Sequence, residues 1–218
     1  MILRITKRSE NEQKYILRIE DEIWGVLSGR ALRSFLGKDN ALPEDGAQVR
    51  MELGDEAFER FVDFLKEQFR AALFDYLGKQ EHSERQAREY LKKQRLHPSI
   101  LEELITAARD LGYVCDTRFA ELFIRSCAMR GKSRKQCQAK LYECGISAST
   151  SKAYLDDYYR AEDTDGMILD GIERLWTRYS SLPENKGREK IVASLYRKGF
   201  ELQRIMAIYD QFRRDKAE

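Results

Sequence analysis

The chain carries the stretch Ser133-Arg-Lys-Gln-Cys-Gln-Ala-Lys-Leu-Tyr-Glu-Cys-Gly-Ile146, and a related stretch lies on either side of it. The earlier one is Ser83-Glu-Arg-Gln-Ala-Arg-Glu-Tyr-Leu-Lys-Lys-Gln-Arg-Leu96, which repeats the serine, a glutamine, a leucine and the closing aliphatic residue. The later one is Gly187-Arg-Glu-Lys-Ile-Val-Ala-Ser-Leu-Tyr-Arg-Lys-Gly-Phe200. Three related copies predict a protein built from tandem repeats.

Two of the copies carry a signal for the start of a helix. Ser83 and Ser133 are each followed three residues later by a glutamine, Gln86 and Gln136. In this arrangement, the capping box, the serine hydroxyl and the glutamine amide satisfy backbone N–H groups of the first turn reciprocally. We therefore expect a helix to begin at each serine, and the corresponding helix of the third copy to begin at Gly187.

The ends of these helices are also marked. A glycine followed by an apolar residue closes two copies, at Gly145-Ile146 and Gly199-Phe200. Glycine adopts the left-handed conformation of a helix stop without the steric penalty of other residues. Arg95 occupies this position in the first copy, so we expect the same turn there, made less stable by its side chain.

Apolar residues recur at helical spacing on both sides of each copy, which predicts three helices per repeat. In the first repeat one stripe runs from Phe58 to Leu77, and another runs from Ile100 to Leu111 after a break at His97-Pro98. The second repeat has Phe119, Leu122, Phe123 and Cys127 before its capped helix, and Tyr154, Leu155, Tyr158 and Tyr159 after it. The third has Ile168, Ile172, Leu175 and Trp176, then Ile205, Ile208, Tyr209 and Phe212. Such units bury only part of their apolar surface alone, so we expect an elongated, curved row of units packed on their neighbours.

Residues 1–54 have a different pattern. Short β-branched runs predict strands at 2–6, 15–19, 23–27 and 49–53, and Ser28 is placed to cap a short helix that ends at Leu36. A proline and a glycine predict a turn over residues 42–46. The predicted fold is therefore mainly α, with a small β-rich domain at 1–54 and three-helix repeats at 55–113, 114–160 and 161–218.

The composition limits the classes of function. The chain has 218 residues, of which 42% are hydrophobic and 35% charged, a profile typical of soluble helical proteins. Its 39 basic and 37 acidic residues give a net charge of only +2, so any basic face must be local. The four cysteines show no C-x-x-C spacing, no signal sequence begins the chain, and no apolar run approaches about 20 residues. We therefore expect a cytoplasmic protein that does not contact the membrane.

Basic residues gather in the second copy. Between Arg118 and Lys140 there are seven basic residues and one acidic residue, Glu121, whereas a merely solvated surface normally mixes the two signs. Weaker basic segments occur at 85–95 and 186–198. If the repeats stack in register, these segments lie along one side, as a nucleic-acid or acidic-protein interface requires. The predicted contact residues are Arg125, Arg130, Lys132, Arg134, Lys135 and Lys140, with Arg88, Lys92, Arg188 and Arg197 as a secondary set.

Motifs for enzyme chemistry are weak. Gly131-Lys132-Ser133 ends like a phosphate-binding loop, but the glycine that this motif needs is replaced by Ser126, and a helix is predicted before it instead of a strand. Cys137 and Cys144 are seven residues apart and are placed to share a helix face, yet buried cysteine commonly serves as a small apolar residue. Since no acid–base constellation or metal-ligand spacing is visible, the sequence predicts neither an enzyme nor a cofactor.

Three stretches resemble the RecX family, which regulates the bacterial recombinase RecA. They are Leu111-Gly-Tyr-Val-Cys-Asp-Thr-Arg-Phe-Ala120, then Arg130-Gly-Lys-Ser133 with the helix that follows it, and Leu195-Tyr-Arg-Lys-Gly-Phe200. The family carries a similar Gly-Tyr-Leu-x-Asp-x-x-Phe-Ala junction between its first two repeats, with Val114 here in place of the leucine. The resemblance covers about residues 57–215, and family members with an added β-rich N-terminal extension are similar to residues 1–54.

The resemblance implies a protein without catalytic activity that acts in homologous recombination, DNA repair and the SOS response. Similar proteins bind along the RecA filament on single-stranded DNA, inhibit its ATPase and strand exchange, and bind DNA weakly without regard to sequence. The resemblance also implies a monomer. Two other interpretations stay open: a sequence-specific transcription regulator with residues 133–143 as its recognition helix, and a structural helical-repeat adaptor that docks a different protein through its aromatic residues.

Overall fold

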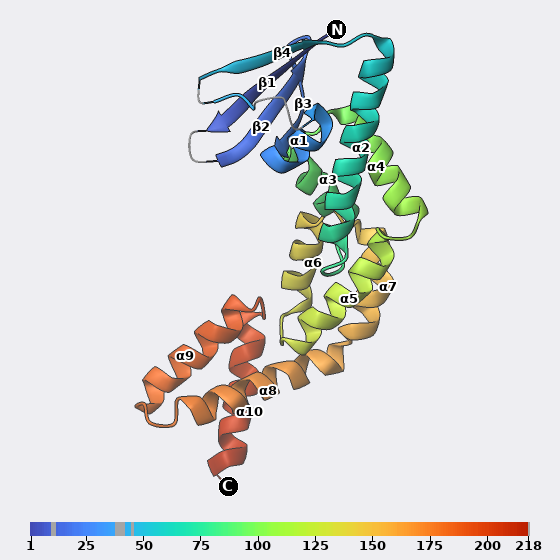
Figure 1. Ribbon diagram of the computed structural model, residues 1–218. Coiled ribbons are helices and arrows are strands. Elements are labelled where there is room, and N and C mark those ends of the chain that lie inside the picture. The colour runs from blue at the N-terminus through green and yellow to red at the C-terminus, as the bar shows by residue number, and fades with distance from the viewer. Residues whose placement is uncertain (10–11, 38–41, 45, 218) are drawn as a thin grey trace. The chain divides into compact units, whose positions relative to one another are not determined.

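In the computed structural model, which describes residues 1–9, 12–37, 42–44 and 46–217, the chain is mainly helical with a small antiparallel sheet at its N-terminus (Figure 1). The described chain divides into two compact units, Met1–Cys115 and Asp116–Glu218. No helix among these residues is both long enough and apolar enough to cross a membrane.

The first unit begins with a four-stranded sheet. Its strands are β1 (Ile2–Ser9), β2 (Glu12–Ile19), β3 (Glu22–Ser28) and β4 (Gln48–Glu52), in the order β3-β2-β1-β4, and all neighbours are antiparallel. Helix α1 (Gly29–Leu36) follows β3, and the Ser28 hydroxyl accepts a hydrogen bond from Ala31 N at 3.2 Å. The four strands and the capped helix confirm the predicted β-rich region, although β1 and β2 extend further than the sequence pattern indicated. The turn predicted over 42–46 includes residue 45, which lies outside the described residues.

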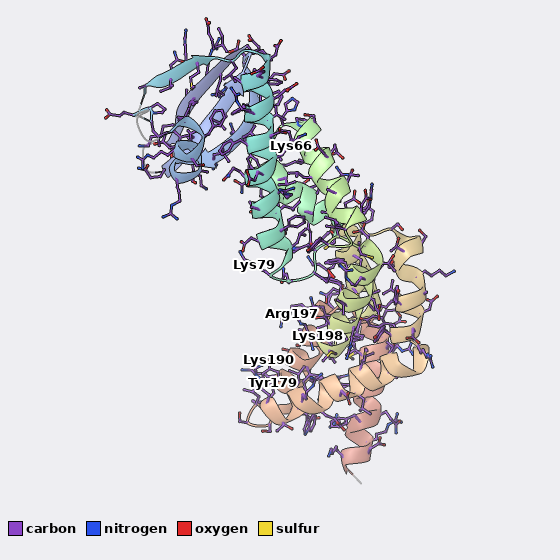
Figure 2. The ribbon with its side chains drawn as sticks, turned by 45° about the vertical axis from the view of Figure 1, so that its right-hand side comes forward. Lys66, Lys79, Tyr179, Lys190, Arg197 and Lys198 are labelled. Atoms are coloured by element: carbon purple, nitrogen blue, oxygen red, sulfur yellow. The ribbon has the colours of Figure 1, made fainter. Side chains whose placement is uncertain are left out.

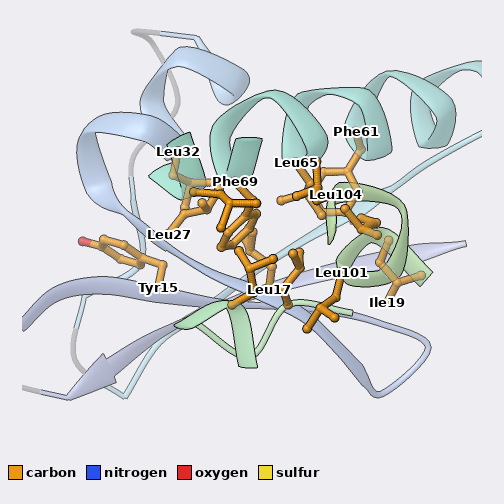
Figure 3. Packing of buried hydrophobic residues seen from close by; sticks show 14 of the residues in the cluster. Tyr15, Leu17, Ile19, Leu27, Leu32, Phe61, Leu65, Phe69, Leu101 and Leu104 are labelled. Atoms are coloured by element: carbon orange, nitrogen blue, oxygen red, sulfur yellow. The ribbon is translucent and has the colours of Figure 1, made fainter. Parts of the chain in front are cut away.

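Three helices complete the first unit: α2 (Asp55–Leu77), α3 (Glu84–Lys93) and α4 (Pro98–Asp110). One face of α2 is buried at every fourth residue, at Phe61, Leu65, Phe69, Leu73 and Leu77, as its apolar stripe predicts. Figure 3 shows how this face packs against Leu17 and Ile19 of the sheet and against Leu101 and Leu104 of α4. The sheet and the three helices therefore share one hydrophobic core, which a sheet of this size needs for stability.

The turn after α3 also joins the sheet. Gln94 O accepts from Val26 N of β3 at 2.9 Å, and His97 N donates to Trp24 O at 3.2 Å, so the turn continues the edge of the sheet. The rings of Trp24 and His97 stack with their centroids 4.2 Å apart. Arg95, between these two contacts, has a φ of 54°. The predicted left-handed turn without a glycine is confirmed.

The second unit contains six helices in two groups of three. Helices α5 (Asp116–Met129), α6 (Arg134–Glu143) and α7 (Ala148–Tyr158) surround one apolar cluster. Helices α8 (Ala161–Arg178), α9 (Glu184–Arg197) and α10 (Leu202–Ala217) surround another, which includes Ile172, Leu195 and Tyr209. The helices lie where the sequence predicts them, whereas the number of repeats and their boundaries remain predictions.

Three details differ from the predictions. Helix α9 begins at Glu184, three residues before Gly187, because Gly187 N donates to Pro183 O at 2.9 Å and so closes a helical turn ahead of the glycine. Leu122 is 45% exposed and does not join the core of its group. The capping box is complete at Ser83 but not at Ser133, where Ser133 N donates to Lys198 O instead of to the Gln136 side chain, and Gln136 Nε2 donates to Arg197 O at 3.0 Å.

The left-handed turn of the first unit gives a stability prediction. Arg95→Gly should raise the free energy of unfolding by about 1 kcal/mol, because glycine adopts a positive φ without steric strain. The control is Lys93→Gly, at the end of α3, which should lower it by about 1 kcal/mol. Urea denaturation of the full chain measures both changes. If Arg95→Gly has a lower free energy of unfolding than the parent, the contacts of the arginine side chain stabilise the fold by more than its strained backbone destabilises it.

Candidate nucleic-acid interface

The loop between α5 and α6 presents two cations. It spans residues 130–133 and turns at Gly131, which has a φ of 62°. Gly131 N donates to Ala128 O at 2.8 Å and Lys132 N donates to Cys127 O at 3.0 Å, so the loop is tied to the end of α5. The side chain of Arg130 is exposed and that of Lys132 is half-buried. Neither forms an ion pair within the described chain.

Two further cations reach the same loop from other helices. A methyl group placed on Gly131 would lie 3.4 Å from Nζ of Lys198 and 3.6 Å from Nη2 of Arg174. Arg174 belongs to α8, and Lys198 follows the end of α9, beside Arg197 (Figure 2). We name Arg130, Lys132, Arg174 and Lys198 the loop cluster. Its members come from three segments far apart in the sequence.

The electrostatics of the loop cluster favour an anion. Burial of the ammonium group lowers the pKa of Lys198, and the neighbouring positive charge of Arg174 lowers it further. No carboxylate of the described residues pairs with Lys198 or Arg174, although Arg174 Nε donates to the backbone oxygen of Asp170 at 3.2 Å. Asp170 and Glu173 line the same hollow as Gly131 and Arg174 but form no ion pair with the cluster in the described chain. Like charges held close together raise the energy of the folded state, and a bound phosphate would relieve it.

A junction between α6 and the end of α9 holds the cluster together. Ser133 N, at the start of α6, donates to Lys198 O at 3.0 Å, and Gln136 Nε2 donates to Arg197 O at 3.0 Å. Gly199 closes α9 with a φ of 87° and packs directly on α6, since a methyl group there would lie 2.5 Å from Ser133 Oγ. The turn of one helix group thus satisfies N–H groups at the start of a helix in the other.

Half of the predicted contact residues carry unpaired charges. Arg125, Arg130, Lys132, Lys135 and Arg197 form no ion pair among the residues that the structure describes. The others are paired. Lys140 lies 2.8 Å from Glu143, Arg188 lies 3.2 Å from Asp210, and Lys92 lies 3.4 Å from Glu89. Exposed pairs of this kind are weak and exchange readily for an external anion.

Arg134 and Arg88 each contact a neighbouring helix. Arg134 forms an ion pair with Asp156 and donates to Leu155 O at 3.1 Å, so it ties α6 to α7. Arg88, in the first unit, contacts Glu84 at 2.9 Å and also pairs with Glu102 of α4, and the hydrogen bond to Glu102 raises its pKa. Both arginines therefore hold neighbouring helices together, and their replacement would test stability as well as binding.

The loop cluster was only partly visible in the sequence. Arg130 and Lys132 belong to the basic segment 118–140, and Lys198 to the segment 186–198. Arg174 lies outside every basic segment and becomes part of the cluster only through the packing of α8. The sequence carried one signal for the junction between α6 and the end of α9. The repeat aligns Gly199 with Gly145, which predicts a helix-ending turn with a positive φ at both glycines.

The alternative chemistries gain no support. Helix α5 precedes Gly131-Lys132-Ser133, so the strand of a phosphate-binding loop is replaced by a helix. Cys137 is buried beside Cys127, and a hydrogen bond from the Cys137 thiol lowers the pKa of Cys127. Across the described chain, no group of histidine, cysteine and carboxylate side chains is arranged to hold a metal ion.

Comparison with known proteins gives one consistent result. No family model matches the chain. A curated Streptococcus pyogenes protein named regulatory protein RecX is 24% identical over 201 residues, which cover 91% of this chain and 72% of that protein. A Staphylococcus aureus protein of the same name is 27% identical over 146 residues, covering 65% of this chain and 53% of the relative.

Solved structures share the fold. A crystal structure of a regulatory protein RecX matches 95% of this chain and 99% of its own, with a TM-score of 0.58 and 18% identity. RecX from Lactobacillus salivarius matches 67% of this chain and 95% of its own, with a TM-score of 0.54 and 24% identity. Helical groups preceded by a small antiparallel sheet define the class of the fold, which these structures share. The curated relatives show that the chain is similar to proteins named regulatory protein RecX, one of them over 91% of its length.

The junction that holds the loop cluster gives a second prediction. Gly199→Ala should destabilise the second unit by more than the strain of a positive φ, because the new methyl group collides with Ser133. Gly112→Ala is the matched control, since Gly112 has a φ of 74° but open space around it. We expect a loss of about 1 kcal/mol for Gly112→Ala and about 2 to 3 kcal/mol for Gly199→Ala, measured by thermal unfolding. Equal losses would show that α9 does not seat on α6.

Proposed function

We propose that this protein binds the RecA recombinase filament on single-stranded DNA and inhibits its ATPase and strand-exchange activity as a monomer. The observation that carries the proposal is the loop cluster, in which Arg174 and Lys198 reach the loop that carries Arg130 and Lys132, and none of the four has an ion pair among the described residues. The names of the relatives supply the regulatory context. The protein acts by occupying the filament, so the proposed mechanism requires no bond-breaking step of its own.

The binding is electrostatic in this proposal. Arginine and lysine neutralise phosphates without reading bases, which gives sequence-independent contact. Arg125, Lys135 and Arg197 extend the basic surface beyond the loop cluster, and all three are exposed. If about four of these cations meet phosphates, the affinity should fall with salt with a log–log slope of roughly −3. Acidic surface of the recombinase is the second target of the same charges.

A sequence-specific regulator fits the junction less well. A recognition helix places its N-terminal residues against base edges in the major groove. In α6 this end is covered, because Ser133 is 5% exposed and its N–H is bonded to Lys198 O. Duplex DNA would have to displace the turn after α9 in order to meet the first turn of α6.

One observation favours the adaptor as a second candidate. Tyr196 and Leu202 are 61% and 49% exposed, and they line a hollow together with Val192 and Met206. An adaptor that docks through this hollow would keep its partner when the loop cluster is neutralised, and would lose it in Tyr196→Ala with Leu202→Ala. The two candidates therefore predict opposite outcomes for the same pair of variants.

The leading proposal is tested by recombinase ATPase activity on single-stranded DNA. Added protein should suppress hydrolysis in a concentration-dependent way. The double variant Arg130→Gln with Lys132→Gln should need about tenfold more protein for half inhibition, which corresponds to about 1.4 kcal/mol. Lys152→Gln with Lys216→Gln removes the same charge from exposed positions outside the cluster and the basic segments, and should inhibit like the parent.

Two results would count against the proposal. Hydrolysis that is unchanged at saturating protein would remove recombinase inhibition as the function. Inhibition that weakens equally in both double variants would show that overall charge, not the loop cluster, is responsible. Thermal unfolding of each variant separates loss of binding from loss of fold.

A further inference from the structure

Three arginines stand side by side on the face of the sheet that is turned away from the helices. Arg4 of β1 is directly opposite Arg18 of β2 on one side and directly opposite Arg50 of β4 on the other. Their neighbours along the strands, Leu3, Ile5 and Leu17, Ile19, are buried in the core on the opposite face. Because side chains alternate along a strand, the three arginines form a row across β2, β1 and β4. We name it the arginine row.

The arginine row is unfavourable for the fold by itself. Cross-strand partners have their Cβ atoms about 5 Å apart, and like charges directly opposite each other destabilise a sheet. The nearest acid that pairs with the row is Asp21, which contacts Arg4 and is itself largely exposed. Glu52 and Glu20 lie on the same face toward the end of the sheet at Ile2, and Glu20 accepts from Ile2 N. In the described part of the chain, one ion pair therefore serves three guanidinium groups.

Each guanidinium group is oriented by one polar neighbour. Arg4 pairs with Asp21, and Arg18 Nη1 donates to Thr6 Oγ1 at 3.3 Å. The Gln48 amide, with its oxygen toward Arg50, accepts from Nη2 at 2.8 Å. A guanidinium group has five N–H donors, so each arginine keeps several for an external acceptor. Arginines that are held in position lose less entropy when they bind a phosphate through paired N–H groups.

We propose that the arginine row binds the phosphate backbone of a nucleic acid strand. Adjacent β-strands are about 4.8 Å apart, so the row places three positive charges in a line across the sheet, where they can contact successive phosphates of a nucleic acid strand. The neighbours on the side away from the acids, Thr6, Ile16 and Gln48, are uncharged, and Lys14 follows beyond them. In this proposal the nucleic acid strand approaches the sheet from this uncharged and basic side. This site is separate from the loop cluster and does not depend on recombinase binding.

The contacts go to phosphates and sugars, not to bases. Single-strand readers that recognise bases stack them on exposed aromatic rings of a sheet. Here the sheet's aromatic side chains are engaged elsewhere: Tyr15 is buried on the core face, and Trp24 stacks on His97 and contacts Phe58. A backbone site without stacking predicts binding that is insensitive to sequence and sensitive to salt.

The test removes two arginines and leaves the Arg4–Asp21 pair in place. Binding of the full chain to a fluorescein-labelled oligothymidylate is measured by anisotropy over a range of salt, without recombinase. Arg18→Gln with Arg50→Gln should weaken binding and lower the log–log salt slope by about 1.4, the value for two lost phosphates on a single strand. The matched control is Arg60→Gln with Arg70→Gln, which removes two exposed arginines from α2 and should leave the slope unchanged.

Stability gives an independent readout. Because the row is a cluster of like charges, Arg18→Gln with Arg50→Gln should unfold at the same temperature as the parent or higher. A lower unfolding temperature would mean that the row is structural and would overturn the proposal. A salt slope that changes as much in the Arg60 and Arg70 control would also overturn it.

Competition with polyglutamate is a third measurement. If the Arg18 and Arg50 variant loses polyglutamate binding but keeps DNA binding, the row recognises an acidic protein instead.

Discussion

A hydrogen bond from Ser133 N to Lys198 O, 3.0 Å long, is the constraint on which the second unit depends. The first N–H groups of a helix have no partner within the helix, so each must find one elsewhere. At α6 the turn after α9 supplies carbonyl oxygens to Ser133 and to the Gln136 side chain. The same turn carries Lys198 to Gly131, so backbone capping and the assembly of the loop cluster have one cause.

The first unit uses the corresponding turn in another way. After α3, Gln94 O accepts from Val26 N and His97 N donates to Trp24 O, so the turn covers the open edge of β3. An exposed sheet edge invites pairing with other chains, and a four-stranded sheet has little core of its own. This contact removes one edge and merges the sheet with α2 and α4 in a single core. One local motif therefore serves as a sheet extension in one unit and as a helix cap in the other.

Local features of the sequence were read correctly because the partner atoms lie within a few residues. The Ser28 cap, the complete box at Ser83 and the left-handed Arg95 are of this kind. The predictions that were wrong or missing concern features that depend on residues far apart in the sequence. Gln136 does not complete its capping box, because its side chain donates to Arg197 O, 61 positions away. Arg174 and the arginine row could not be found from the sequence, because packing and strand register place them.

Residue-resolved amide hydrogen exchange of the full chain tests the seating of α9 on α6 most directly. Ser133 and Ser147 are both helix N-caps whose hydroxyls accept a hydrogen bond. Ser133 N is bonded to Lys198 O, whereas Ser147 N has no partner among the described residues. The Ser133 amide should therefore exchange much more slowly than the Ser147 amide. Equal, fast exchange at both positions would contradict the junction and with it the assembly of the loop cluster.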